Sequence, residues 1–343
     1  MGHSSAGGDF DTGCASNTRP EDWGIEGLSL GIVLTGPSDT REWQKALTWV
    51  RRAEELGLHS VWVPESHFGR GVCASPLLTL SGFAAQSRRL RLGTISLLLP
   101  IHPPLRLAAE IASLDSLSGG RVLIGLGRGF RAPLFQAFGI DPGSRRDRFD
   151  DALDRILASW RGEDGRDART DGGRPRQPPH PPLAVAAFGR KGLAQAARRG
   201  LPYLASPLEP LPLLIENQRF HSENLPEDAD PGALATPVLR TVHVASSEPE
   251  RRRVFEALEA ELRAAGRMAR GKAPAALARA VAGPLRERVI VGSPSEVSDT
   301  LARYREELGM DLLIARPQIA GASEAECEAS LERLAGEVLP GLG

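Results

Sequence analysis

Apolar and polar positions alternate in two repeating patterns from Leu28 to the end of the chain. Short apolar runs are typical of buried parallel strands, and the longer runs between them have the three-and-four spacing of amphipathic helices. Strands are predicted at 28–34, 60–64, 90–100, 121–127, 182–188, 201–206, 236–246 and 311–319, and helices at 40–57, 75–87, 104–118, 144–160, 190–200, 212–224, 250–262, 293–309 and 324–339. Eight strands favour a (β/α)8 TIM barrel over a doubly wound sheet, because the single G-x-G-x-G run follows the fourth strand and not the first.

The domain organisation follows from the segments that lack this alternation. Residues 1–26 are rich in small polar residues with almost no apolar periodicity, and they predict a flexible N-terminal leader. Residues 27–343 then form a single barrel domain. Two irregular insertions, 161–182 and 263–284, interrupt it. Each is expected either to lie over the mouth of the barrel or to form a solvated linker or surface helix.

Composition excludes several classes of partner. The 42 basic and 43 acidic residues nearly cancel, which argues against nucleic acid. No apolar stretch approaches the roughly 20 residues needed to span a bilayer, and no signal-peptide core is visible, so we expect no membrane association and a cytoplasmic location. The three cysteines are far apart and predict free thiols. No metal-binding motif appears, and none is expected.

Polar residues directly after the second predicted strand are the first candidates for chemistry. The run Glu65-Ser66-His67-Phe68 follows this strand, and the carboxyl ends of barrel strands converge on one face. A histidine beside an acid acts as a general base or hydrogen-bonds a cofactor. The alternative is that Glu65 pairs with a nearby arginine and that His67 is a packing residue.

Two glycine-containing loops predict a phosphate site. Arg128 and Gly129 follow the fourth strand, and Phe188, Gly189, Arg190, Lys191 and Gly192 lead from the fifth strand into a helix. Glycines let backbone amides approach an anion, arginine offers a forked donor, and a helix N-terminus favours negative charge. A tight strand exit explains a lone glycine loop equally well, but the two loops together favour one phosphate.

The order of the motifs is similar to that of the luciferase-like monooxygenases. ESHF, SPLLTLSGFAAQSRRLRLGTISLLLPIHPPLRLAAEIASLDSLSGGRVLIGLGRGF, FGID, QPPHPPLAVAAF and VGSPSEVSDTLARY agree with that family in order and spacing, closest to its bacterial luciferase branch. The resemblance implies a barrel that binds reduced FMN, or alternatively the deazaflavin coenzyme F420, in its mouth. It implies that Arg128 and residues 188–192 hold the phosphate, and that a non-prolyl cis peptide between Ile95 and Ser96 supports the ring.

The sequence departs from the family at two places. Active members usually carry EHHF, and Ser66 replaces the first of these histidines. A serine hydroxyl is no base near neutral pH, so Ser66 indicates either a different chemistry or a lost one. Arg190 and Lys191 replace hydroxyl and acidic residues of the phosphate loop, and they suit either FMN or the more highly charged F420.

Three functions are therefore expected in order. The first is a monooxygenase that uses reduced FMN from a separate flavin reductase, together with oxygen, to oxidise a small organic substrate. The second is an F420-dependent hydride-transfer oxidoreductase, and the third is a non-catalytic flavin-binding or subunit-like luciferase homologue. Phe68, His102 and Arg316 are candidates for substrate contact, with a salt bridge as the alternative for Arg316. Apolar stripes on helices 40–57 and 104–118 suggest a homodimer, although core packing explains them equally well.

Overall fold

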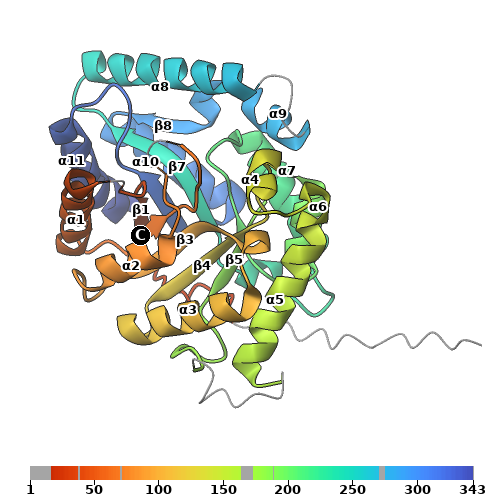
Figure 1. The fold of residues 1–343 in the computed structure, drawn as a ribbon. Helices are drawn as coiled ribbons and strands as arrows, with labels where there is room; N and C mark the ends of the chain where they lie inside the picture. The colour runs from red at the N-terminus through yellow and green to blue at the C-terminus, as the bar shows by residue number, and fades with distance from the viewer. Residues whose placement is uncertain are drawn as a thin grey trace, which may run out of the picture.

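The computed structural model describes residues 17–37, 39–69, 72–163, 173–187, 189–269 and 275–342. In this part of the chain nine parallel strands form one curled sheet in the order β6-β5-β4-β3-β2-β1-β9-β7-β8, with helices around its outer face (Figure 1). The strands are β1 Ser29–Val33, β2 Ser60–Val63, β3 Arg91–Leu98, β4 Val122–Gly127, β5 Leu183–Ala186, β6 Tyr203–Leu204, β7 Pro237–Val244, β8 Val289–Gly292 and β9 Leu312–Arg316. The parallel alternation that the sequence predicts is confirmed.

The strand count differs from the predicted eight. The additional strand β8 is a four-residue apolar run that lies beside only the second half of β7, from Thr241 to Val244. The first half of β7 pairs with β9. At the opposite edge, Ala205 just after β6 forms an isolated parallel bridge with Val238 of β7. The described residues therefore show a curled parallel sheet with one strand more than a simple eight-strand count.

Most helices begin and end where the sequence predicts. They are α1 Thr40–Glu55, α2 Pro76–Ala84, α3 Pro104–Ser118, α4 Ala132–Ala137, α5 Arg145–Arg161, α6 Arg190–Ala197, α7 Leu211–Ser222, α8 Glu248–Ala269, α9 Ala275–Val281, α10 Pro294–Leu308 and α11 Glu324–Arg333. The Asp39 side chain caps α1 by accepting from the Glu42 amide, and a capping box starts α10 at Ser293. The short helix α4 was not predicted, and α9 lies in the second insertion, for which a surface helix was one of the expected alternatives. Among these described helices none combines the length and the apolar character required to cross a bilayer.

Part of the segment that was expected to be a leader packs against the sheet. Trp23 is completely buried and stacks on Trp62 of β2 at a ring-centroid distance of 6.3 Å. Its backbone carbonyl accepts a 2.9 Å hydrogen bond from His59 Nε2, and burial lowers the pKa of His59 to about 4, so this imidazole is neutral near pH 7. Residues 17–26 therefore form an ordered segment on the sheet, because Trp23 and Ile25 supply apolar surface to the inner core. Residues 1–16 lie outside the described residues.

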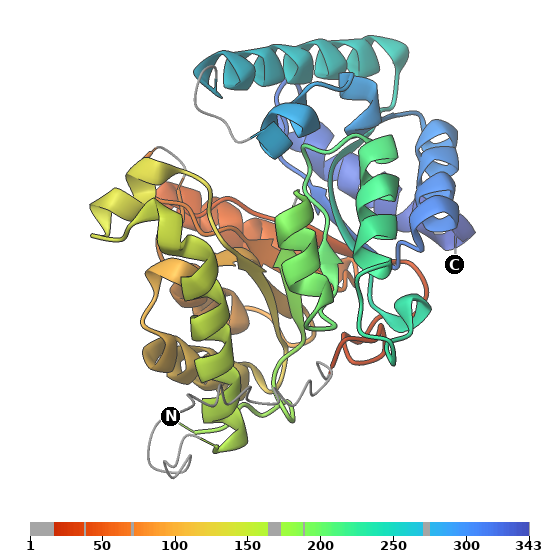
Figure 2. The same cartoon turned by 90° about the vertical axis from the view of Figure 1, so that its right-hand side faces the viewer.

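The two insertions lie at opposite ends of the sheet. In the described part of the first, Gln177 donates to the Asp115 carboxylate and to the carbonyl of Val122, the first residue of β4. This places it at the amino ends of the strands, away from the mouth. The second extends α8 and forms α9, which lies toward the opposite end in Figure 2. Among the described residues of the two insertions, those of the second thus reach the carboxyl ends of the strands.

Candidate functional site

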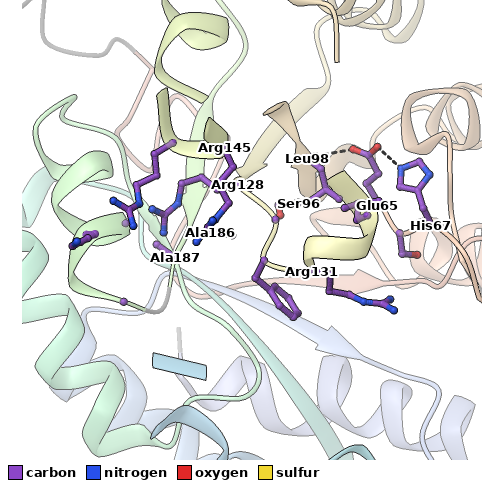
Figure 3. Close-up of a pocket in the computed structure, with 18 of the residues that line it drawn as sticks. Glu65, His67, Ser96, Leu98, Arg128, Arg131, Arg145, Ala186 and Ala187 are labelled. Carbon is purple, nitrogen blue, oxygen red and sulfur yellow. Dashed lines mark hydrogen bonds and ion pairs between the residues drawn. The ribbon is translucent and has the colours of Figure 1, made fainter. Parts of the chain in front are cut away.

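A cavity of about 810 Å³ opens at the carboxyl ends of β2 to β5. This volume lies within the range of pockets that bind small molecules and cofactors. Figure 3 shows its two chemically different sides: Arg128 and Arg145 lie on one side, Glu65 and His67 on the other, and Ser96 lies between them. The lining is formed by Glu65, Ser66, His67, Phe68, Ile95, Ser96, Leu98, Gly127, Arg128, Gly129, Phe130, Arg131, Pro133, Leu134, Arg145, Arg146, Ala186, Ala187, Gly189, Arg190, Lys191, Gly192 and Ala275.

Glu65 is the hydrogen-bonding centre of one side of the cavity. Its buried carboxylate accepts from His67 Nε2 at 2.8 Å, from His102 Nε2 at 2.9 Å and from the Leu98 amide at 2.7 Å. Burial alone would raise the pKa of this carboxyl, but its hydrogen bonds with the two histidines and the Leu98 amide hold the pKa below its usual range. Glu65 therefore remains ionised and fixes the orientation of His67.

Ser66 has a local structural role. Its hydroxyl accepts a 3.0 Å hydrogen bond from the Cys73 amide, and the Ser66 amide donates to the Cys73 carbonyl at 2.8 Å. These two bonds close the loop that follows β2 and present Phe68 to the cavity. Ser66 lines the cavity, and its hydroxyl is engaged in holding the loop.

The bulge in β3 carries the predicted cis peptide. The bond between Ile95 and Ser96 is cis, and the pairing of β3 with β4 shifts register between Ile95 and Leu97. Ser96 then faces Gly127 of β4 so closely that a Cβ at Gly127 would meet Ser96 Oγ at 2.1 Å. The glycine run of β4 thus accommodates the bulge, which brings Ser96 into the cavity between its two sides.

Arg128 is the centre of the cationic side, and its side chain is half-buried. Its Nε is buried and has no hydrogen-bond partner among the described residues. Burial, together with repulsion from Arg146 and Arg145, lowers the pKa of Arg128 to about 10, against a weaker attraction from Asp150. A half-buried cation whose nearest charges include two further cations requires an anion, because the protein itself supplies too little compensation.

The N-terminus of α6 lies directly against this arginine. The N-cap residue, Gly189, offers no side chain to cap the first amides of the helix. A Cβ at Gly192 would meet the Arg128 guanidinium at 2.0 Å, so only glycine allows this approach. Arg190 and Lys191 line the same cavity. Helix amides and guanidinium together suit a phosphate group. Phe188, predicted as part of this loop, lies outside the described residues.

Two members of the cationic side were not predicted. Arg145 and Arg146 form the first turn of α5 and line the cavity with Arg128. Basic residues in the first turn of a helix oppose the helix dipole. That conflict between the run RRDR and its position was the signal in the sequence that could have identified them.

The remaining predicted residues take different positions. Gly129 lines the cavity with a positive φ of 66°, and Phe68 lines it with a largely exposed ring. His102 does not line this cavity. It hydrogen-bonds the Glu65 carboxylate and lines an outer groove between α2 and α3. Arg316 lies apart and pairs with Glu261 of α8 at 3.0 Å, which is the salt bridge given as its alternative. In the described residues no cluster of His, Cys, Asp and Glu side chains could hold a metal ion.

Replacing Glu65 is expected to change stability in a pH-dependent way. Since the folded-state pKa lies below the unfolded value near 4.5, the ionised carboxylate stabilises the fold above that pH, and this contribution is lost as pH falls through the folded-state pKa. We expect Glu65→Gln to lower the free energy of unfolding by about 2 kcal/mol at pH 7, because charged hydrogen bonds are lost. The difference should shrink below pH 4. Urea unfolding at pH 7 and pH 3.5 measures both, with Glu110→Gln on the surface of α3 as the control; a constant difference would refute the charged role.

Comparison with known proteins places the chain in a family. The description "Luciferase-like monooxygenase" matches residues 28–312. An uncharacterized protein, y4wF, from Sinorhizobium fredii is 32% identical over 62% of this chain and 65% of its own length. The oxygenase component of a flavin-dependent trigonelline monooxygenase from Acinetobacter baylyi is 26% identical over 84% of this chain and 86% of its own.

Solved structures agree on the fold. Apo-MsnO8 superimposes with a TM-score of 0.74 at 25% identity, covering 92% of this chain and 99% of that one. The monooxygenase RslO1 from Streptomyces bottropensis gives a TM-score of 0.73 at 24% identity, with 92% and 100% coverage. The family expected from the motifs is confirmed by the match over residues 28–312. The chain belongs to the luciferase-like monooxygenase family.

Proposed function

We propose that this protein is a flavin-dependent monooxygenase that uses reduced FMN and oxygen to oxidise a small organic substrate. The observation that carries the proposal is the half-buried Arg128, whose buried Nε lacks a partner in the described residues and which lies against the glycine-rich start of α6. An FMN phosphate supplies the missing anion. The remaining cavity extends to Glu65 and leaves room for a ring system.

The residues of the chain have separate tasks in this proposal. Arg128, Arg145 and the amides of α6 bind the phosphate. The bulge at Ser96 supports the ring between the two sides of the cavity. His67 is oriented by Glu65 and exchanges a proton with the substrate, while the aromatic residues at the mouth limit access of water. The bound reduced flavin would supply the electrons and the site of oxygen activation.

A separate reductase is proposed as the source of reduced flavin. The sequence contains no second nucleotide fingerprint that would bind NAD(P)H. The relative from A. baylyi is named an oxygenase component, which supports an external reductase for a chain of this type. This chain is therefore proposed to receive its flavin already reduced.

The direct test is an anaerobic titration of the protein with reduced FMN and, separately, with reduced F420, followed by admission of oxygen. We expect reduced FMN to bind and oxygen to be consumed, with a transient absorbance distinct from oxidised FMN. Binding of F420 alone, without oxygen consumption, would replace the monooxygenase by a hydride-transfer enzyme. Binding of reduced FMN without oxygen consumption would indicate the non-catalytic flavin-binding alternative that Ser66 suggests, and binding of neither cofactor would refute a flavin-binding function.

The F420 alternative is supported by one feature. A second basin of about 430 Å³ adjoins the cationic side and shares Arg146, Arg190 and Lys191 with the main cavity. Arg198 adds a further cation, although Asp147 and Asp150 also line this basin. A cofactor with an anionic tail beyond its first phosphate could occupy it. An F420-dependent tetrahydromethanopterin reductase has the same general fold, with a TM-score of 0.67 at 18% identity.

A homodimer is proposed to form over the groove between α2 and α3. Leu78 and Leu117 are 71% and 64% exposed there, and the groove measures about 600 Å³. A self-complementary apolar patch on two adjacent helices suits a two-fold pair. We expect Leu117→Glu to convert a dimer into a monomer at micromolar concentration, measured by light scattering. Arg106→Glu at the rim is the charge control, and a wild-type monomer would refute the proposal.

A further inference from the structure

Exposed phenylalanines gather at the mouth of the cavity. Phe68, Phe130 and Phe138 are 65%, 46% and 42% exposed, and in the described residues the other large apolar side chains of comparable exposure are the two leucines of the α2–α3 groove. Phe68 and Phe130 line the cavity. Phe138 ends α4 and contacts the rings of Phe68 and His67. We call Phe68, Phe130, Phe138 and His67 the aromatic rim.

The backbone conformation of Phe68 holds its ring in an exposed position. Its φ is 58°, a left-handed conformation that a bulky side chain adopts rarely. The hydrogen bonds between Ser66 and Cys73 close the loop that holds it there. Such a backbone outlier at a cavity is a reason to look for a ligand contact. The loop presents an aromatic face to the mouth at a conformational cost.

The rings of the rim are arranged to receive another ring. The centroid of His67 lies 5.9 Å from that of Phe68 at an interplanar angle of 43°, and 5.1 Å from that of Phe138 at 77°. Phe68 and Phe138 are 6.1 Å apart. Tilted and edge-to-face pairs at these separations leave ring faces available for a planar ligand. A rigid ring also loses less conformational entropy on binding than an alkyl chain of similar area.

One polar group lies within this apolar surface. Glu65 accepts from Nε2 of His67, so Nδ1 is the ring nitrogen left for a ligand. In that tautomer Nδ1 is an acceptor, and a hydroxyl group is its natural donor. In the proposed function, the cofactor phosphate pairs with the arginines on the opposite side of the cavity. The rim therefore combines ring faces with one acceptor.

From these observations we infer that the substrate is a planar aromatic compound carrying a hydroxyl group, packed against the exposed rings of Phe68 and Phe138 with its hydroxyl donating to His67. The inference rests on the proposed function for the cofactor that reacts with this substrate. Binding of the substrate does not require the cofactor, because the rim is formed by the protein alone.

The test is calorimetric binding of matched probes to the protein with and without oxidised FMN. 2-Naphthol and decahydro-2-naphthol share size and hydroxyl, but only the first is planar and aromatic. We expect 2-naphthol to bind at least about tenfold more tightly, because each aromatic contact is lost in the saturated probe. 2-Methoxynaphthalene, which cannot donate, should bind several-fold more weakly than 2-naphthol, about the effect of one hydrogen bond.

Variants assign the preference to the rim. Phe68→Leu keeps an apolar side chain and removes the ring, and it should reduce the preference for 2-naphthol by about fivefold or more with little effect on decahydro-2-naphthol. Leu78→Ala, at an equally exposed position on α2, should change neither. Thermal unfolding checks that each variant is folded.

The outcomes separate this inference from the proposed function. Equal binding of the planar and saturated probes, with FMN bound normally, would overturn the aromatic substrate and leave the flavin enzyme standing. A naphthol preference that depends on Phe68 without any FMN binding would support the inference and reject the FMN assignment. If Phe68→Leu weakened the binding of both probes equally, the rim would be a general apolar surface, and the inference would also be overturned.

Discussion

Arg128→Gln is expected to weaken FMN binding at least about 100-fold, equivalent to about 2.7 kcal/mol, while leaving the free protein as stable as before or more stable. The affinity falls because the guanidinium is the half-buried donor for the phosphate, and charge-assisted hydrogen bonds to an anion are strong. Stability does not fall, because in the free protein this guanidinium is desolvated, its Nε lacks a partner in the described residues, and Arg145 and Arg146 repel it.

Two measurements on the same variant test this pair of effects. Quenching of FMN fluorescence gives the dissociation constant, and urea unfolding without flavin gives the stability. Arg106→Gln on the exposed surface of α3 is the control and should change neither. Inorganic phosphate should raise the melting temperature of the wild type and have less effect on Arg128→Gln. An affinity within threefold of the wild type would refute the role of Arg128.

Trp23→Ala is expected to destabilise the protein by about 3 to 5 kcal/mol, the usual cost of truncating a buried tryptophan. Trp23 is completely buried, stacks on Trp62, and its indole Nε1 donates to the Asn17 carbonyl at 3.2 Å. Removing it opens a cavity at the amino ends of the strands. The effect on flavin affinity should be small, because the cavity proposed to bind the cofactor lies at the other end of the sheet.

Denaturant unfolding measures this cost. Trp43→Ala provides a matched control on α1, since Trp43 is only partly buried and makes an edge contact with Phe83. It should cost clearly less than Trp23→Ala. If Trp23→Ala lowered the free energy of unfolding by less than about 1 kcal/mol, the segment 17–26 would contribute little to the fold.

The alternation of strands and helices could be predicted from the sequence because it is local. Continuous apolar runs such as 122–127 are typical of buried parallel strands. Strand β8 was missed because four apolar residues after a long insertion resemble any short buried segment. Trp23 was missed because its neighbours are polar and show no period, so only the folded sheet reveals the apolar surface that it covers.

The candidate site was predicted in part for the same reason. Arg128 and Lys191 follow strands directly, and their position in a parallel sheet is enough to bring them together. Arg145 begins a helix 17 residues after Arg128, and its approach depends on how α5 packs. One of the two interpretations of the run at Glu65 paired its carboxylate with a nearby arginine. The structure gives His67 and His102, and the second of these becomes a neighbour only through the β3 bulge and the turn that follows it.

The lining of the cavity is distributed unevenly along the chain. Apart from Ala275, every residue that the structure places in it lies between Glu65 and Gly192, in the half of the fold that contains β2 to β5. Strands β1 and β6 to β9 supply the rest of the sheet without contributing directly to that surface. Substitutions around α9 should therefore change which molecules enter the cavity. The proposed catalytic residues, which lie in the other half of the fold, would stay unchanged.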